Sequence, residues 1–537
     1  MGQRRRLAPL VPLLLAAVLF LPGIGQRIIY IGDEARYALL ARTMVETGDW
    51  LVPRIGDEVH MEKSPLFIWA IAAMSLAGRR VTELTAVLPA ALSGIGGVGM
   101  TYVLGRRMFG PRAGFLAALI LATTWGYYWH ARLALADMMV TFFVVAGAAA
   151  FWSAVAGNQE RRAPMAIFWA CLGLGFSAKG PVGFMPLLPF GAFLIREHGW
   201  RGLSKLRPLM GIAIVAVIAA PWALAFALQR EESYVQSVLI GDFLAPRLRA
   251  WDRFSELFFA LGPIGIGFLP WTPFLPAAVR GGWWRADSDD LRRAFRFLGY
   301  WVLAYVIVIT VLPHKRDRYL LPTLPALALM VAWLWNRWMS PSIPRALRVH
   351  GFVWSAVAVI LAVVVVFPLR ARVEVMALLP PTLAGKLVLV GLLLGAAVLA
   401  LVAASAGRAR ATFAAVCVPM ALVLVYESHV FVTRHNELFD IRSFARRLAP
   451  RVGAHDALAT YRYQNLALAL YAGRTVMRAQ NPVELQRLLS DGRPVYVIVD
   501  DRGWREMVDA SGRSWTVLDQ APVAGRTLLF ATTTARP

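Results

Sequence analysis

Charged residues and cysteine are both scarce in this chain of 537 residues. Only 16% of the residues are charged while 58% are hydrophobic, more apolar surface than a soluble protein of this size can bury. The two cysteines, Cys171 and Cys417, both lie inside apolar runs, so the sequence predicts no disulfide framework. The composition predicts an integral membrane protein.

Acidic residues are few beside basic ones: 32 Asp and Glu against 56 Lys and Arg give a formal net charge of +24. The basic residues form short clusters between apolar runs, so they indicate the positive-inside pattern of a membrane protein, and we expect no nucleic-acid partner. We expect a cytoplasmic N-terminus and an outward-facing tail. The clusters that set this orientation are Arg4–Arg6, Arg106–Arg107, Arg161–Arg162, Arg196–Arg207, Arg280–Arg296, Arg337–Arg348 and Arg408 with Arg410.

Apolar runs long enough to cross a bilayer recur along the chain and predict an all-α polytopic protein with about 13 transmembrane helices. The first run follows Arg4–Arg6, and Gly25-Gln26-Arg27 offers no small-x-small cleavage site, so we expect this helix to be retained. The predicted spans are 7–25, 83–104, 113–129, 138–156, 164–177, 181–195, 208–228, 262–279, 297–312, 319–336, 351–368, 387–406 and 411–431.

The predicted outer face carries a first loop (26–82), a later loop (229–261) and the tail. Within the first loop, 33–48 has the apolar spacing of an amphipathic helix lying on the membrane, with Gly48 as its stop, and 64–78 is a second such segment. The tail contains strand-like "PVYVIVDD" and helix-like "NPVELQRLLS". We therefore predict a transmembrane catalytic domain over 1–431 and a small outer α/β domain over 432–537.

Several motifs that would define other functions are missing from the sequence. It has no Gly-rich nucleotide loop, no G-x-S-x-G elbow and no CxxC pair, so a reaction that uses ATP or NAD is not expected. His60, His130 and His314 lack metal-ligand spacing, so the sequence supports neither a metal site nor a divalent-metal cofactor. The absence of an internal repeat, and of charges at mid-span, disfavours a lipid or solute transporter, the non-enzyme alternative.

The stretch "YIGDEARYA" places two adjacent acids, Asp33 and Glu34, at the start of the amphipathic helix. Asp33 could cap the free N–H groups of this helix, and Glu34 would favour its dipole. The same position on the outer face also suits a catalytic carboxylate. Asp137, at the outer end of a later span, leaves the same two interpretations open.

Lysine is rare, with five in the chain, and three of them lie at predicted outer edges. These are Lys63 in "HMEKSP", Lys179 in "FSAKGP" and Lys315 in "PHKRDRYLLP". Each could be a snorkelling flank residue, but a compact ammonium also suits a phosphate. Arg253, Arg316 and Arg318 add further cations on this face.

Acids and cations thus gather at one leaflet edge beside apolar helices. A sugar carried on a polyprenyl phosphate needs an apolar groove for the lipid and cations for the leaving phosphate. It also needs a carboxylate that takes a proton from the acceptor or orients it. The pattern predicts a transferase acting on a lipid-borne phosphate donor.

Further motifs support this interpretation. "GDEARYALLARTMVETGDWLVP" and "GDEVHMEKSP" resemble the first outer loop of C-type (GT-C) glycosyltransferases, most closely the bacterial lipid A aminoarabinose transferases and more distantly the protein O-mannosyltransferases. "LALADMM", "SAKGP", "PWALAFALQRE", "FLPWTPFLP" and "KRDRYLLPTLPALAL" extend the resemblance over nearly the whole chain.

The resemblance implies an inverting membrane enzyme with roles for specific residues. Asp33, Glu34 and Asp137 match the catalytic acids, and Tyr37 and Glu62 would support them. The residues implied to bind the donor phosphate or lipid are Arg36, Lys63, Lys179, Arg253, Lys315, Arg318 and Tyr319.

We therefore predict a glycosyltransferase of the bacterial inner membrane with a periplasmic active site and a periplasmic C-terminal domain. Its donor would be a sugar on undecaprenyl phosphate, and the sugar 4-amino-4-deoxy-L-arabinose or a similar one. The acceptor would be lipid A. A protein O-mannosyltransferase-like enzyme, or one acting on another envelope glycan, stays open as the alternative.

Overall fold

A computed structural model gives the fold of the chain, and most of the sequence is described by it. The described residues are 10–56, 58–60, 63–156, 161–228, 259–284, 287–311, 315–340, 345–367, 378–463 and 465–533.

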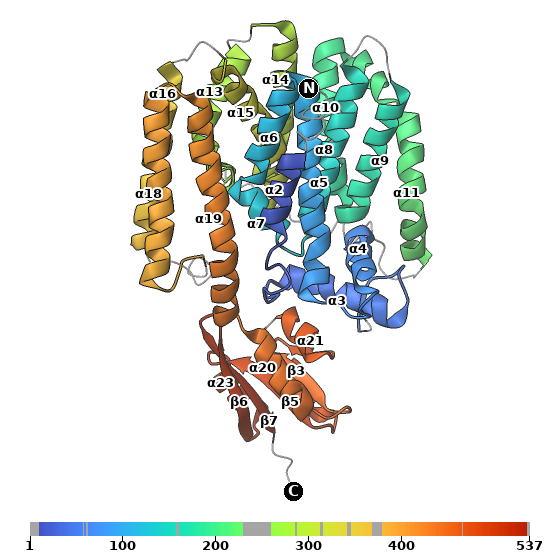
Figure 1. Cartoon of the computed structure of the whole chain (residues 1–537). Helices are drawn as coiled ribbons and strands as arrows, with labels where there is room; N and C mark the ends of the chain where they lie inside the picture. Colours follow the sequence, from blue (N-terminus) through green and yellow to red (C-terminus); the bar gives the residue numbers. More distant parts are fainter. Residues whose placement is uncertain are drawn as a thin grey trace.

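A helical bundle forms the larger part of the molecule (Figure 1). Within the described ranges, nine helical segments are long and apolar enough to cross a membrane. The prediction of a multi-pass, mostly helical membrane protein is therefore confirmed. The helices of these segments are α5 (Glu83–Phe109), α8 (Ala136–Val155), α9 (Arg162–Lys179), α11 (Pro208–Leu228), α14 (Asp289–Val311), α15 (Leu324–Trp338), α16 (Arg345–Val366), α18 (Leu383–Ser405) and α19 (Ala409–Leu438).

The predicted count of 13 spans is not confirmed, because several predicted spans are short or broken in the described part of the chain. The run at 113–129 is split into two helices at Thr123-Thr124, and prolines and glycines break the run at 262–279 into three short helical pieces. These and the remaining bundle elements are α2 (Leu10–Phe20), α6 (Pro111–Ala122), α7 (Trp125–Ala131), η1 (Gly180–Phe184), α10 (Leu187–His198), η2 (Trp200–Leu206), α12 (Leu261–Gly267), η6 (Thr272–Phe274), α13 (Leu275–Val279), η7 (Arg280–Trp284) and η8 (Asp317–Thr323).

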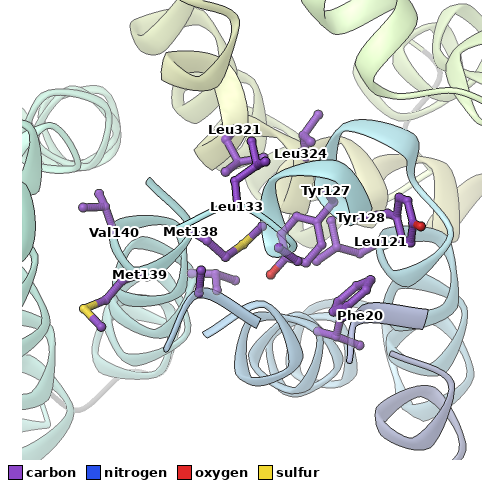
Figure 2. Close-up of a cluster of buried hydrophobic side chains, with 14 of the residues drawn as sticks. Phe20, Leu121, Tyr127, Tyr128, Leu133, Met138, Met139, Val140, Leu321 and Leu324 are labelled. Carbon is purple, nitrogen blue, oxygen red and sulfur yellow. The ribbon is translucent and has the colours of Figure 1, made fainter. Parts of the chain in front are cut away.

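Small residues and aromatic rings hold the centre of the bundle together. A Cβ added at Gly114 of α6 would lie 2.6 Å from the backbone of α5, so only glycine permits this close approach of the two helices. Figure 2 shows the neighbouring core, where Phe20 packs against Tyr127 and Tyr128 with ring centroids 6.0 and 6.4 Å apart. The same view places Leu321, from η8, over this core. The segments α7, α8 and η8 are thereby fixed against one another.

The predicted amphipathic helices are present and lie across one end of the bundle (Figure 1). Helix α3 (Gly32–Thr47) ends where Gly48 adopts φ +75°, as the sequence predicts. A short hairpin of two-residue strands, β1 (Arg54–Ile55) and β2 (Glu58–Val59), precedes α4 (Pro65–Ser75). Helix α4 begins at Pro65, as expected.

The tail forms a small domain around a five-stranded mixed sheet of order β4-β3-β5-β7-β6. The first three strands in this order are parallel, and β7 pairs antiparallel with both β5 and β6. The predicted strand and helix are confirmed as β5 and α22. The elements are α20 (Ile441–Leu448), η9 (Ala449–Arg451), β3 (Ala457–Tyr461), α21 (Leu466–Ala472), β4 (Met477–Ala479), α22 (Pro482–Ser490), β5 (Val495–Asp500), α23 (Trp504–Ser511), β6 (Trp515–Val523) and β7 (Arg526–Thr533).

This domain packs on the same end of the bundle as α3 and α4 (Figure 1). The Tyr471 hydroxyl accepts a hydrogen bond from the Ile29 backbone N–H at 2.8 Å and donates to Glu83 at 3.2 Å. Arg442 also donates to Glu83, at 2.8 Å. These contacts hold the first loop between the bundle and the sheet.

Candidate active site

Asp33 lies in the first turn of α3, but it does not cap the helix. The N-cap residue is Ile31, and no side-chain hydrogen bond caps this end of the helix. Instead, Arg318 of η8 donates from Nη2 to Asp33 Oδ2 at 2.5 Å. The interpretation of Asp33 as a helix cap is therefore wrong. The Asp33 carboxylate is held in place by its ion pair with Arg318, which lies 285 positions later in the chain.

Further cations surround the Asp33 carboxylate. Lys63 Nζ lies 4.0 Å from Oδ1, and Arg36 Nη1 lies 3.9 Å from the same oxygen. Arg316 Nη1 lies 4.0 Å from Oδ2. These cations come from α3, the first loop and η8, so the fold gathers three separate segments around one acid.

Asp137 is the second acid of the site and lies in the first turn of α8. Its side chain is only 7% exposed and is paired with Lys179, the last residue of α9. Arg318 Nε lies 3.7 Å from Asp137 Oδ2. Arg318 therefore bridges Asp33 and Asp137, and the two acids belong to one site.

Two aromatic rings, those of Tyr37 and Tyr319, lie beside the lysines of this site. The Lys63 ammonium lies 5.8 Å from the centre of the Tyr37 ring. The Lys179 ammonium lies 5.1 Å from the centre of the Tyr319 ring. Each ring face stabilises its ammonium and limits where the lysine can point.

The charges in this site are not balanced. Among the described residues, five cations pair with the two carboxylates of Asp33 and Asp137, so this set holds three more cations than acids. We call these seven residues the cationic cluster. The buried Nε–H of Arg318 also makes no hydrogen bond within the described residues. An unsatisfied donor and excess positive charge favour binding of an anion. The members are Asp33, Arg36, Lys63, Asp137, Lys179, Arg316 and Arg318.

This charge distribution fixes the protonation state of Asp33. Burial alone would raise the pKa of its carboxyl, but the positive charges of Lys63, Arg318 and Arg316 outweigh burial and lower that pKa below its ordinary value. Burial raises the pKa of Tyr37, and the negative charges of Asp137 and Asp33 add to this effect. At neutral pH the acid is therefore ionised and the phenol is neutral.

Glu34, although adjacent to Asp33, is not part of the cationic cluster. Its side chain is fully buried and paired with Arg27, and it accepts a hydrogen bond from the Ala134 N–H at 2.7 Å. Because it faces protein on all sides, it positions the segment before Asp137 and does not meet a substrate. The burial of Glu34 favours a positioning role, and the catalytic role stays a prediction. The sequence shows only two adjacent acids, so it could not distinguish a catalytic role from a positioning role.

Three other residues singled out from the sequence are placed less directly. Lys315 is half-buried and precedes Arg318 by three residues in the segment that enters η8. Arg253 and Glu62 lie outside the described residues. No group of three or more His, Cys, Asp or Glu side chains in the described ranges is arranged to hold a metal ion.

An apolar cavity of about 500 Å³ opens beside the cationic cluster. Its lining includes Asp317 and Leu320 of η8, which flank Arg318 and Tyr319 in sequence. Trp125 and Trp129 of α7 and Ile266 of α12 form much of the apolar wall. The sequence did not reveal this cavity, because its walls come from separate stretches of the chain between Trp125 and Leu378.

The fold and the cluster define a class: a polytopic membrane protein with the fold of C-type glycosyltransferases. The chain superposes on the crystal structure of ArnT from Cupriavidus metallidurans in the apo state with a TM-score of 0.80 and 21% identity, covering 97% of both chains. The same protein bound to undecaprenyl phosphate gives 0.76 and 20%, again covering 97% of both. The apo oligosaccharyltransferase of Archaeoglobus fulgidus is more distant, with a TM-score of 0.58, 13% identity and coverage of 95% and 71%.

Sequence similarity points to particular relatives within this class. The family model of dolichyl-phosphate-mannose-protein mannosyltransferases matches residues 62–224. The undecaprenyl phosphate-alpha-4-amino-4-deoxy-L-arabinose arabinosyl transferase of Edwardsiella ictaluri is 28% identical over 349 residues, which are 62% of this chain and 59% of that protein. The match thus spans about three fifths of the length of this relative. The resemblance predicted from the motifs is confirmed.

Proposed function

We propose that this protein is an inverting glycosyltransferase that takes a sugar from undecaprenyl phosphate and transfers it to an acceptor at the outer face of the membrane. The proposed sugar is 4-amino-4-deoxy-L-arabinose or a close analogue, and the proposed acceptor is lipid A. The names of the relatives support the donor. The motifs of the first outer loop support the acceptor.

The observation that carries this proposal is the buried Nε–H of Arg318, which makes no hydrogen bond within the described residues and lies in a cluster where the described cations outnumber the acids. A donor phosphodiester brings one negative charge, and the leaving lipid phosphate gains another as the sugar–oxygen bond breaks. Arg318, with its unsatisfied Nε–H, and Lys63 would stabilise this developing charge. A site with equal numbers of positive and negative charges would have to break its own ion pairs to bind the phosphate, and nothing would compensate for their loss.

The reaction assigns a role to each acid. An acceptor oxygen attacks the anomeric carbon from the face opposite the phosphate, so the configuration inverts. If that oxygen belongs to a hydroxyl group, ionised Asp33 takes its proton, and if it belongs to an anion, Asp33 orients the acceptor. Asp137, which is more buried, holds Lys179 and Arg318 in position. Asp33 is thus the proposed catalytic residue and Asp137 the positioning residue.

The surroundings of the cluster suit a lipid-linked donor. We assign the apolar cavity beside η8 to part of the lipid tail, because tryptophan and leucine side chains line it and its polar rim is next to the cluster. We further propose that residues 1–431 form the catalytic membrane domain and that 432–537 form a periplasmic domain, with a cytoplasmic N-terminus. The basic loops at one side of the predicted spans support this orientation.

Transfer by the purified protein tests the proposal. The full chain in detergent would be supplied with the undecaprenyl-phosphate-linked aminopentose and lipid A, and the product identified by its mass. Asp33→Asn is expected to reduce transfer by about 10²- to 10⁴-fold, the usual contribution of a catalytic carboxylate. Asp49→Asn is the matched control, because Asp49 is an exposed acid of the same outer segment that lies outside the cluster. An Asp33→Asn protein with full activity would contradict the assignment.

One observation favours a second candidate function, transfer of a hexose to a protein. The family model that matches residues 62–224 describes protein mannosyltransferases. A polyprenyl-phosphate-linked mannose and an unfolded Ser/Thr-rich peptide would replace the two substrates in the same assay. Peptide modification without modification of lipid A would select this alternative.

A further inference from the structure

A second cavity, separate from the cationic cluster, lies between the first outer loop and the C-terminal domain. It has a volume of about 320 Å³, enough for a phosphorylated sugar. One wall is formed by α3 and the β1–β2 hairpin, and the other by α21, β4 and the turn between them. The hairpin approaches the domain closely, because a Cβ added at Gly56 would meet Thr475 Oγ1 at 3.5 Å.

Three arginines line this cavity: Arg42 from α3, and Arg474 and Arg478 from the C-terminal domain. Arg474 donates only to backbone carbonyls, those of Val452, Gly453 and Asp456, at 2.9 to 3.0 Å. A carbonyl satisfies the donors of a guanidinium but does not neutralise its charge. Arg474 is therefore held by several hydrogen bonds, and within the described residues it has no carboxylate at ion-pair distance.

The other charges leave the cavity positive. Arg42 donates to the Ala469 and Leu470 carbonyls at 3.4 Å and is paired with Glu46 at 3.1 Å, outside the lining. Arg478 is exposed. Glu58 is the acid that lines the cavity, and it is also exposed. Lining hydroxyls from Thr43 and Thr475 complete a set of groups suited to phosphate oxygens.

The position of the cavity relates it to the proposed chemistry. Arg42 follows Asp33 by nine residues in the same helix, so the two lie about 14 Å apart along its axis at 1.5 Å per residue. The cavity is thus rigidly connected to the proposed catalytic residue and opens on the same end of the bundle. A headgroup that reaches both would carry its phosphate at some distance from its reacting oxygen.

We propose that this cavity, which we call the arginine cleft, binds a phosphate group of the acceptor, remote from the acceptor oxygen that reacts. The ligand class is a phosphorylated glycolipid headgroup, held between Arg42, Arg474 and Arg478. The inference rests on the proposed function, because it assigns the C-terminal domain a part in recognition of the acceptor. The binding itself can be measured whether or not transfer occurs.

The test is a direct binding measurement on the full chain in detergent. The probes are a glycolipid with a phosphate at each end of its headgroup, the same lipid with one phosphate removed, and inorganic phosphate. Arg478→Gln should weaken binding of the bis-phosphorylated lipid by about three- to tenfold, as expected for one partly exposed charge-assisted contact. Glu58→Gln removes the opposing charge and should tighten binding by about twofold to threefold. The mono-phosphorylated lipid should respond to neither variant.

Arg487→Gln provides the matched control, because Arg487 is an exposed arginine of the same domain outside the cleft. Equal affinities of Arg478→Gln, Glu58→Gln and the unchanged protein for the bis-phosphorylated lipid would overturn the proposal. Inorganic phosphate that binds as tightly as the lipid would overturn the headgroup assignment and identify a free-phosphate site. If no sugar is transferred but the two variants shift binding as stated, the proposed function fails and the cleft stands.

Discussion

Two groups of ionic residues lie close together in the molecule and differ in how their charges are compensated. The cationic cluster holds five cations and two carboxylates, and Asp33 within it keeps 22% of its side-chain surface exposed. The second group, which we call the buried network, contains Arg27, Arg132, Glu34 and Glu427, each at most 7% exposed. It contains as many acids as cations, and Arg27 is paired with Glu34. The difference suggests that the balanced, buried charges stabilise the fold, whereas the surplus, accessible charges are available to bind a ligand.

The charged side chains of the buried network connect helices of the bundle. Arg132 donates to the carbonyls of Leu19 and Phe20 at 3.2 Å, where α2 ends, and Arg27 is paired with Glu34. A cavity of about 10 Å³, room for about one water molecule, lies among Arg27, Arg132 and Glu427. The network thus joins α2, α3, α7 and α19 beneath the site.

The largest effect is expected from breaking the buried pair. Glu34→Ala leaves Arg27 without its carboxylate and the Ala134 N–H without an acceptor, which should destabilise the fold by about 3–5 kcal/mol. Glu34→Gln keeps an acceptor for Ala134 and should cost less. Thermal unfolding in detergent measures both. The double variant Arg27→Gln/Glu34→Gln should lose less than the two single variants added together, and strict additivity would refute the pairing.

A second prediction concerns Arg318, which bridges the two acids of the cationic cluster. Arg318→Gln removes the donor that meets Asp33 at 2.5 Å and the charge that faces Asp137. Transfer should fall by about 10²- to 10³-fold, the loss typical of one transition-state donor. The unfolding temperature should change far less than it does for Glu34→Ala. A stability loss as large as that of Glu34→Ala would remove the distinction between the two groups.

The sequence predicted the local elements of the site region well. Gly48 and Pro65 mark helix boundaries because a left-handed stop and a first-turn proline are determined by backbone sterics within a few residues. The scarcity of lysine also directed attention to Lys63 and Lys179, which both lie in the cluster. These inferences need no knowledge of distant contacts.

Long-range pairing was beyond the sequence. Nothing local distinguishes Asp33 from Glu34, yet one meets Arg318 and the other is bonded to Ala134, 100 residues away. The same holds for the arginine cleft, where Arg42 meets a domain more than 400 residues later. The predicted number of spans was not confirmed for a different reason, since hydrophobicity does not report where an apolar run is divided into short helices.

A smaller effect is expected at the other acid of the buried network. Glu427 is 4% exposed, and its Oε1 makes no hydrogen bond within the described residues. Glu427→Gln keeps the shape and one acceptor of this side chain, so the unfolding free energy should change by only about 1 kcal/mol. Transfer activity should not change. A large loss of activity with an unaltered unfolding temperature would place Glu427 among the functional residues. It would contradict the distinction between the buried network and the cationic cluster.

The smallest effect is a shift in pH dependence, and its sign follows from the cationic cluster. Asp33 must be ionised to act, and its pKa lies below the ordinary value because Lys63, Arg318 and Arg316 outweigh its burial. Activity, and the stability gained from these ion pairs, should therefore persist below the ordinary carboxylate range and be lost as the pH falls through the lowered pKa. Arg316, 55% exposed and 4.0 Å from Asp33, is screened by solvent.

Arg316→Gln should consequently raise the pKa of Asp33 only slightly. The acid limb of the pH profile of kcat/KM should move to higher pH by about 0.3, a fraction of the effect expected for a buried charge. Added salt should move the limb of the unchanged protein in the same direction and that of the variant less. Arg434→Gln, in an ion pair with Glu437, supplies the control, because this pair lies outside the cluster. An acid limb that does not move in Arg316→Gln, or that moves to lower pH, would contradict this expectation, because the loss of a nearby positive charge must raise the pKa of Asp33, and Asp33 would no longer be the residue whose ionisation controls transfer.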